Sequence, residues 1–103
     1  MVFIETSLFT KLLPKYLSDD EYKAFQWHML NNPAIGDIVP GSGGVRKVRW
    51  SQTGKGKRAG IRIIYYWKKS ADEIWLLTLY SKSEKSTISA NILKKITEEI
   101  QDE

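Results

Sequence analysis

The residue best placed for chemistry in this 103-residue chain is an arginine inside an apolar segment. Arg62 interrupts the β-branched and aromatic residues 61–67, and in an extended strand it shares a face with Ile64 and Tyr66. A guanidinium within such a strand costs free energy unless it pairs with an acid, such as Glu5, or is open to a ligand. Arg62 is therefore a candidate ligand-binding residue, with a salt bridge as the structural alternative.

A second group of polar side chains follows the next apolar segment. Tyr80 and Lys82 have the same strand parity as Leu76 and Thr78, so we expect them on one face. If Arg62 lies on that face too, three long polar side chains meet on one sheet surface. Arginine can hold a phosphate with two hydrogen bonds, lysine adds a point charge, and tyrosine can stack on a base or transfer a proton. The set is suited to a phosphodiester.

Basic residues are concentrated in the middle of the sequence. The net charge is +4 and the pI is about 9.3, which favours anionic partners. No acid lies between Asp37 and Asp72, a stretch that holds 9 of the 16 basic residues: Arg46, Lys47, Arg49, Lys55, Lys57, Arg58, Arg62, Lys68 and Lys69. A solvated surface is the simpler interpretation, but a polyanion site explains the absence of acids better.

Several classes of site are excluded by composition. The chain has no cysteine and a single histidine, His28, which we expect on a helix surface. Thiol catalysis, a histidine-pair nuclease, a Ser–His–Asp triad and a histidine metal site are therefore excluded, and no acid cluster has metal-ligand spacing. We expect no cofactor and no small-molecule ligand. The sequence shows neither a signal-peptide pattern nor 18 consecutive apolar residues, so we expect a cytoplasmic protein without membrane contact.

The elements that would position these residues can be read from periodicity and turn signals. Residues 2–4 predict a strand, and 7–16 a helix that Pro14 limits or kinks. Ser18 and Glu21 have the spacing of a capping box. They begin a second helix whose apolar positions are Tyr22, Phe25, Met29 and Leu30, and which ends at residues 31–33.

The second half of the sequence predicts three strands and a helix. Turn residues at 36–44 precede strands at 45–51, 61–67 and 74–80, with a basic loop at 52–60 and a hairpin turn at 68–72. Ser89 would cap a last helix with the apolar positions Ile92, Leu93, Ile96 and Ile100. This order predicts an α+β fold, with N-terminal helices packed on a small antiparallel sheet and a C-terminal helix, in one domain of residues 1–103.

Three segments of the sequence resemble a known family. GSGGVRKVRW (41–50), GKGKRAGIRIIYYW (54–67) and LLTLYSKSEKSTISANILKKI (76–96) are similar to the signature blocks of RelE/HigB-like toxins of bacterial type II toxin–antitoxin systems, within the RelE/ParE superfamily. The N-terminal half has the same helix-and-turn pattern. Departures are small: Ala59 stands where a second glycine is common, and Ser83 where asparagine is common.

The resemblance implies a function and assigns residues to it. Members of the family enter the ribosomal A site and cut mRNA there, and a co-encoded antitoxin holds them inactive. Arg62 matches the family's strand arginine, Tyr80 its aromatic residue and Lys82 the lysine of its Y-x-K-x-E block, while Lys57 and Arg58 match its basic loop. Together with these loop residues, we expect the following to contact RNA or the ribosome: Arg46, Lys47, Arg49, Lys55 and Lys85.

The residues and the resemblance lead to one reaction, a metal-independent cleavage. The RNA 2′-hydroxyl would attack the adjacent phosphorus, while Arg62 and Arg58 stabilise the pentacovalent charge. Either Lys82 or Tyr80 would move the protons. The expected partners are a cognate antitoxin, which blocks either the active site or entry to the ribosome, the 70S ribosome and mRNA.

Two other functions are compatible with the sequence. ParE-type toxins share the scaffold but act on DNA gyrase and are not nucleases. A non-catalytic RNA-binding module would use the same basic residues only to hold phosphates. Tyr80 and Lys82 favour the nuclease, because a gyrase inhibitor has no evident need for them.

Overall fold

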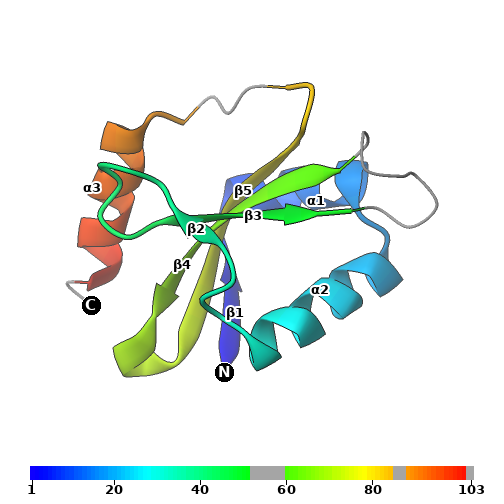
Figure 1. The fold of residues 1–103 in the computed structure, drawn as a ribbon, viewed down its shortest axis with the longest axis horizontal. Helices are drawn as coiled ribbons and strands as arrows, with labels where there is room; N and C mark the ends of the chain where they lie inside the picture. The colour runs from blue at the N-terminus through cyan, green and yellow to red at the C-terminus, as the bar shows by residue number, and fades with distance from the viewer. Residues whose placement is uncertain (52–59, 85–87, 102–103) are drawn as a thin grey trace.

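A five-stranded sheet runs through the computed structural model, which describes residues 1–51, 60–84 and 88–101. The strands lie in the order β1-β5-β4-β3-β2 (Figure 1). Their bounds are Val2–Glu5 (β1), Asp37–Ile38 (β2), Arg46–Trp50 (β3), Ile61–Lys68 (β4) and Glu73–Ser81 (β5). The predicted α+β fold is confirmed, with β4 at the centre. The sheet is mixed, because β1 pairs parallel to β5 whereas the other pairs are antiparallel.

Three helices begin at side-chain caps. In α1 (Ser7–Tyr16) the N-cap is Thr6, whose hydroxyl accepts from the Phe9 N–H, and Pro14 lies within the helix without ending it. The predicted capping box of α2 (Asp19–Asn31) is confirmed, with Glu21 N donating to Ser18 Oγ at 3.1 Å. The helix α3 (Ala90–Gln101) begins after Ser89, as predicted.

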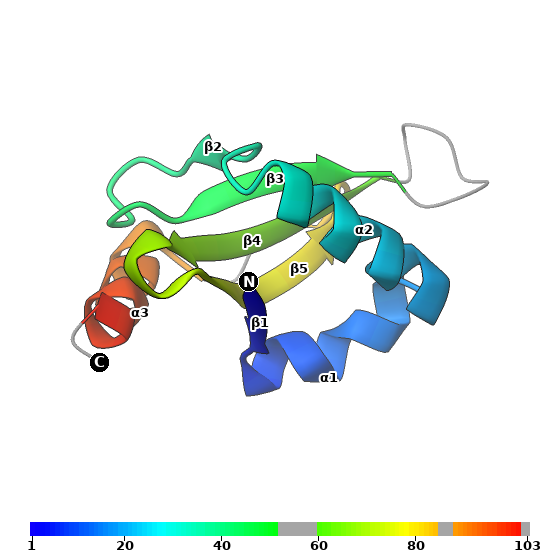
Figure 2. The ribbon, with the colours of Figure 1, turned by 90° about the horizontal axis from the view of Figure 1, so that it is seen from below.

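The helices cover opposite faces of the sheet (Figures 1 and 2). On one face, α1 and α2 place Phe9, Phe25 and Met29 against the larger core, where these side chains are fully buried. On the other face, α3 buries Leu93 and Ile100. Each such side chain contributes roughly 1.5–3 kcal/mol by leaving water. Side chains of β4 and β5 thus pack into a core on each face of the sheet.

Two of the apolar helix positions predicted to be buried are largely exposed. Leu30 in α2 and Ile92 in α3 remain 44% and 49% exposed. In α3 the buried position is taken instead by Thr97, whose hydroxyl donates to Lys94 O at 2.7 Å. None of the described helices is long and apolar enough to cross a membrane.

A β-bulge changes the face of one residue that the sequence placed near Tyr80. On β4, Ile64 pairs with Thr78 but Tyr65 pairs with Leu76, so β5 carries one extra residue between them. The prediction that Leu76 shares a face with Tyr80 is therefore wrong: Leu76 packs in the α1–α2 core. The bulge lies before Thr78 and does not affect the end of β5 that follows it.

Candidate functional site

Two arginines and a tyrosine form a row across the three central strands. Arg49 on β3 pairs with Arg62 on β4, and Arg62 pairs with Tyr80 on β5. Directly opposite residues of antiparallel strands point to the same face, with Cβ atoms about 4.5–5.5 Å apart. Arg62 and Tyr80 therefore share a face, which is the condition that the sequence left open. We call Arg49, Arg62 and Tyr80 the arginine–tyrosine row.

Lys82 follows the row at the end of β5. The strand ends at Ser81, but Lys82 N donates to Gly60 O at 3.0 Å, which continues the ladder by one residue. Lys82 itself lies in the turn that follows and is exposed. The structure thus brings Arg62 and Tyr80 to one sheet face and Lys82 to the turn at the end of that face.

Glu84 fixes the turn that carries Lys82. Its Oε1 accepts hydrogen bonds from Ser81 N (3.0 Å), Ser81 Oγ (2.7 Å) and Tyr16 OH (2.6 Å), and Lys15 Nζ lies 3.9 Å from Oε2. The hydrogen bond from Tyr16, followed by those from Ser81, lowers the pKa of Glu84 to about 2. Burial raises the pKa of Tyr16 to about 12, and its bond to Glu84 adds to this. The turn is thereby tied to the end of α1.

The sequence reasoning did not assign Glu84 a role. Glu84 is the acid of the Y-x-K-x-E block, and this motif could have marked it as a residue of the site. Its partner Tyr16 lies 68 residues away in sequence, and only the packing of α1 against β5 brings the two together.

The row lies open rather than paired with acids. Arg62 is half-buried, and no carboxylate of the described residues lies within 4.0 Å of its guanidinium. Glu5, the sequence's candidate partner, instead accepts hydrogen bonds from Thr10 Oγ1 (2.7 Å) and Tyr22 OH (2.8 Å). The uncompensated guanidinium therefore remains available to an anion.

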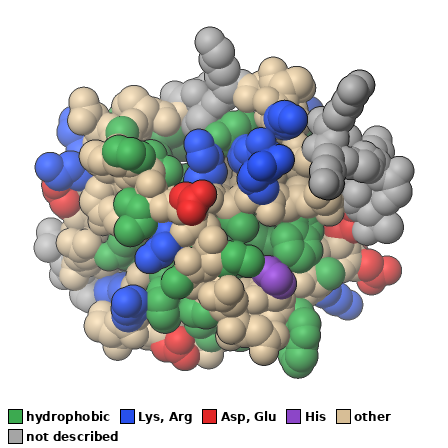
Figure 3. All heavy atoms as spheres, viewed as in Figure 1, with side chains coloured by type: hydrophobic (Ala, Val, Ile, Leu, Met, Phe, Trp, Pro, Cys, Tyr) green, Lys and Arg blue, Asp and Glu red, His purple; other side chains and the backbone are tan. Residues whose placement is uncertain are grey.

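A hollow of about 290 Å³ lies beside the row. Its lining includes Arg49, Arg62, Trp50 and Gly60. Lys and Arg side chains gather over β3 in the surface view (Figure 3). Trp50 packs with its ring centroid 5.3 Å from those of Phe25 and His28. His28 is exposed on α2, as predicted. The hollow offers two arginines to one bound group.

Tyr80 is suited to donate a proton. Burial raises the pKa of its phenol, and the positive charge of Arg62 opposes this only in part. The phenol is therefore protonated at neutral pH, where it can donate a hydrogen bond or a proton but is a poor base.

The other predicted RNA contacts divide into three sets. Lys47 is exposed on β3 with the parity of Arg49. Arg46 points away from the row, and its Nη1 donates to Gly36 O (2.7 Å) and Ala34 O (3.2 Å). Outside the described residues lie Lys55, Lys57, Arg58 and Lys85.

The acidic and histidine side chains of the described ranges form no cluster of three that could hold a metal ion.

Comparison with solved structures identifies the fold, although no family model matches the chain. A double arginine-to-alanine mutant of the E. coli toxin RelE in the free state aligns with a TM-score of 0.63, over 92% of this chain and 96% of that one, at 16% identity. The isolated E. coli RelE toxin aligns with a TM-score of 0.60, over 92% and 97%, at 17% identity. The chain has the RelE fold. The resemblance read from the sequence therefore agrees with the arrangement of the RelE-fold elements.

Proposed function

We propose that this chain is a RelE-like toxin that cuts translated mRNA in the ribosomal A site and is inhibited by a cognate antitoxin. The observation that carries the proposal is the arginine–tyrosine row, in which two arginines that form no ion pair with an acid of the described residues lie beside a protonated phenol on one face of a RelE fold. A gyrase inhibitor or a passive RNA-binding module has no need for a proton donor beside two arginines.

The reaction starts from the 2′-hydroxyl of the RNA. Its oxygen attacks the adjacent phosphorus, the bond to the 5′-oxygen breaks, and a 2′,3′-cyclic phosphate and a 5′-hydroxyl end result. Arg62 and Arg49 stabilise the negative charge of the pentacovalent state, because guanidinium groups donate paired hydrogen bonds to phosphate oxygens. Arg49 thus joins the proposed catalytic residues, whereas from the sequence we expected it only to contact RNA or the ribosome.

The protonation state of Tyr80 assigns one of the two proton transfers: the protonated phenol donates to the leaving 5′-oxygen. Lys82 takes the proton of the 2′-hydroxyl when its amine is neutral, and as an ammonium it instead adds positive charge beside the phosphate. Arg58, Lys55, Lys57 and Lys85 belong to the proposal on the basis of sequence alone.

The direct test uses purified ribosomes stalled with a defined codon in the A site. The wild-type chain should cut the mRNA within that codon and leave a 5′-hydroxyl on the downstream fragment. Tyr80→Phe removes the proton donor and keeps the ring, so the cleavage rate should fall by about 10²–10⁴-fold. Cleavage of free RNA at the same rate as ribosome-bound mRNA would contradict the requirement for the ribosome.

A further inference from the structure

The hollow beside the arginine–tyrosine row contains an aromatic side chain that the proposed reaction does not use. Trp50, the last residue of β3, lines this hollow of about 290 Å³ together with Arg49 and Arg62. Bases of RNA stack on aromatic side chains, while arginines bind phosphate oxygens. A hollow that combines both kinds of group is suited to a nucleotide.

The indole of Trp50 is held in place by two rings of α2. Its centroid lies 5.3 Å from that of Phe25, at an interplanar angle of 78°, and 5.3 Å from that of His28, at 53°. Phe25 is fully buried and anchors the contact in the α1–α2 core, whereas His28 is exposed. Neither contact is a parallel stack. A side chain that is already fixed loses less entropy when a ligand binds to it.

The polar edge of this indole is open. Trp50 is half-buried, and its Nε1–H donates to no group of the described residues. The atom is not buried either, in contrast to Nε1 of Trp67. An indole N–H that is buried in a protein usually finds an acceptor there. The exposed N–H of Trp50 is therefore available to a ligand, which a tryptophan that only seals the core would not need.

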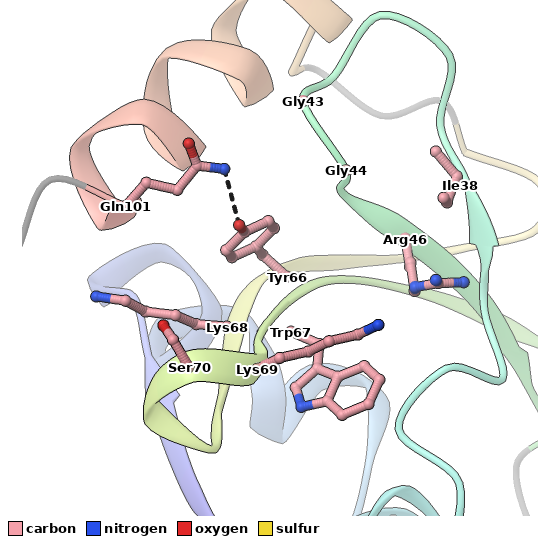
Figure 4. A pocket seen from close by; sticks show the side chains of 10 residues that line it. All are labelled: Ile38, Gly43, Gly44, Arg46, Tyr66, Trp67, Lys68, Lys69, Ser70 and Gln101. Carbon is pink, nitrogen blue, oxygen red and sulfur yellow. Dashed lines mark hydrogen bonds between the residues drawn. The ribbon is translucent and has the colours of Figure 1, made fainter.

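The aromatic residues of a second hollow differ in this respect. That hollow, of about 440 Å³, lies between β2, the end of β4 and the end of α3 (Figure 4). There Lys69 extends across Trp67, with its Nζ 4.9 Å from the ring centroid. The hydroxyl of Tyr66 accepts a hydrogen bond from Gln101 Nε2 at 2.8 Å. Both rings already have polar partners within the chain, so Trp50 is the better candidate for a ligand contact.

The free edge of β3 connects Trp50 with the arginines. Successive strand residues point to opposite faces, and Trp50 pairs with Ile61 of the α1–α2 core, whereas Arg49 pairs with Arg62. Among the described strands, β2 pairs only with the first two residues of β3, so the edge beside Arg49 and Trp50 is uncovered. A nucleotide carries its phosphate and its base on different sides of the ribose. One nucleotide can therefore reach both faces around this edge.

The charge of the surroundings matches a nucleic acid. The histidine lies beside hydrophobic side chains, on the face of the molecule where Lys and Arg side chains gather over β3 (Figure 3). No acid lies between Asp37 and Asp72 in the sequence, so β3, β4 and the residues that join them contribute no carboxylate. Aromatic side chains combined with a positively charged surface are typical of sites for single-stranded nucleic acid.

We propose that Trp50 stacks on a base of the cut codon and so positions the nucleotide whose phosphate Arg49 and Arg62 bind. The inference rests on the proposed function for the identity of the RNA. It adds a base-binding residue on the opposite face of the sheet from the arginine–tyrosine row. Trp50 transfers no proton and carries no charge, so its contribution is the placement of the codon.

The first test measures single-turnover cleavage on stalled ribosomes. Trp50→Leu removes the aromatic ring and should lower the rate by about tenfold or more, the scale of one lost base stack. Trp50→Phe keeps an aromatic ring and should lower it by less than about threefold. Trp27→Leu is the matched control, because Trp27 is 69% exposed on α2 and lies outside the hollow. It should leave the rate unchanged, and circular dichroism verifies that each variant is folded.

The second test removes the base instead of the indole. An abasic nucleotide is placed at each position of the A-site codon in turn. At the position that Trp50 contacts, the wild-type chain should slow by about tenfold or more. Trp50→Leu has already lost the stack, so the same abasic nucleotide should slow it by less than about threefold. Such a non-additive pair of losses is the signature of a direct contact.

Other outcomes overturn the inference in recognisable ways. Equal cleavage rates for the wild-type chain and Trp50→Leu exclude the stack and leave the proposed function standing, and additive losses mean that the indole has a structural role. Normal cleavage by Trp50→Leu with weaker binding of the protein encoded beside this gene assigns the ring to a protein interface.

A binding measurement decides the inference even if the wild-type chain cuts no mRNA, in which case the proposed function fails. Calorimetry compares a short oligoribonucleotide with an oligomer of the same length that lacks its bases. Loss of the bases should raise the Kd of the wild-type chain by about tenfold or more and that of Trp50→Leu by less than about threefold. Equal affinity of the wild-type chain for both oligomers, or no binding of either, would contradict the stack.

Discussion

Replacing Arg62 by glutamine should separate activity from stability. Arg62 faces Arg49 directly across β3 and β4, and no acid of the described residues neutralises it. Glutamine keeps much of the aliphatic stem and removes the charge. We expect the cleavage rate to fall while the free energy of unfolding rises, because a residue retained for phosphate binding is here a source of electrostatic repulsion.

The size of both effects follows from the geometry. Charged groups of a cross-strand pair lie roughly 6 Å apart, where two like charges repel by about 0.7 kcal/mol in a water-like dielectric. Salt and the exposure of Arg49 reduce this, so we expect a gain of about 0.3–0.7 kcal/mol, or roughly 1–6 °C in Tm. Loss of one charge-stabilising donor should lower the cleavage rate by about 10²–10³-fold.

The assay combines urea unfolding with single-turnover cleavage on stalled ribosomes. Lys11→Gln is the matched control, because it removes the same charge from an exposed position on α1. It should change neither quantity measurably. If Arg62→Gln instead lowers the free energy of unfolding by more than about 1 kcal/mol, the arginine has a structural role and the reasoning is wrong.

Three further predictions concern Glu84, Tyr65 and the 2′-hydroxyl of the RNA. Glu84→Gln should lower the kcat of cleavage with little change in KM, because it loosens the Lys82 turn. Because the pKa of Glu84 is lowered in the folded state, its ionised carboxylate stabilises the fold fully above pH 4.5. The difference in the free energy of unfolding between wild type and Glu84→Gln, measured by urea titration, should therefore shrink as the pH falls from 4.5 toward about 2. Tyr65→Phe should lower the free energy of unfolding by about 1–3 kcal/mol, measured by urea unfolding, because the buried phenol accepts from Gly36 N and donates to Pro33 O. A 2′-deoxynucleotide at the cleavage position should block cutting on stalled ribosomes, and normal cutting there would exclude 2′-hydroxyl attack.

Local patterns predicted most of the elements because their signals are local. Ser18 and Glu21 form the capping box that their spacing indicates, and the apolar segment around Arg62 forms the central strand. Strand alternation grouped Tyr80 with Lys82 and Arg62 with Ile64, but only the register of β4 with β5 shows that Arg62 and Tyr80 share a face. The predicted features depend on contacts between neighbours in sequence or on the two-residue period of a strand.

The remaining features depend on contacts between distant residues. The parallel pairing of β1 with β5 and the bulge that turns Leu76 to the α1–α2 core are set by tertiary packing, which strand periodicity does not encode. The pairing of Arg49 with Arg62 needs the register of β3, and the contact of Glu84 with Tyr16 needs the position of α1. The sequence therefore predicted which residue types form the site but not which neighbours position them.

The most direct test of the central claim is a map of mRNA 5′ ends, aligned with the reading frame, in cells producing the wild-type chain or Arg62→Gln. The account predicts cuts inside translated codons, with 5′-hydroxyl ends, in the wild-type sample and their near absence with Arg62→Gln. Untranslated regions of the same transcripts should remain intact. Growth arrest with intact mRNA and halted DNA replication would contradict the account and point to gyrase, and 5′-phosphate ends would contradict the mechanism.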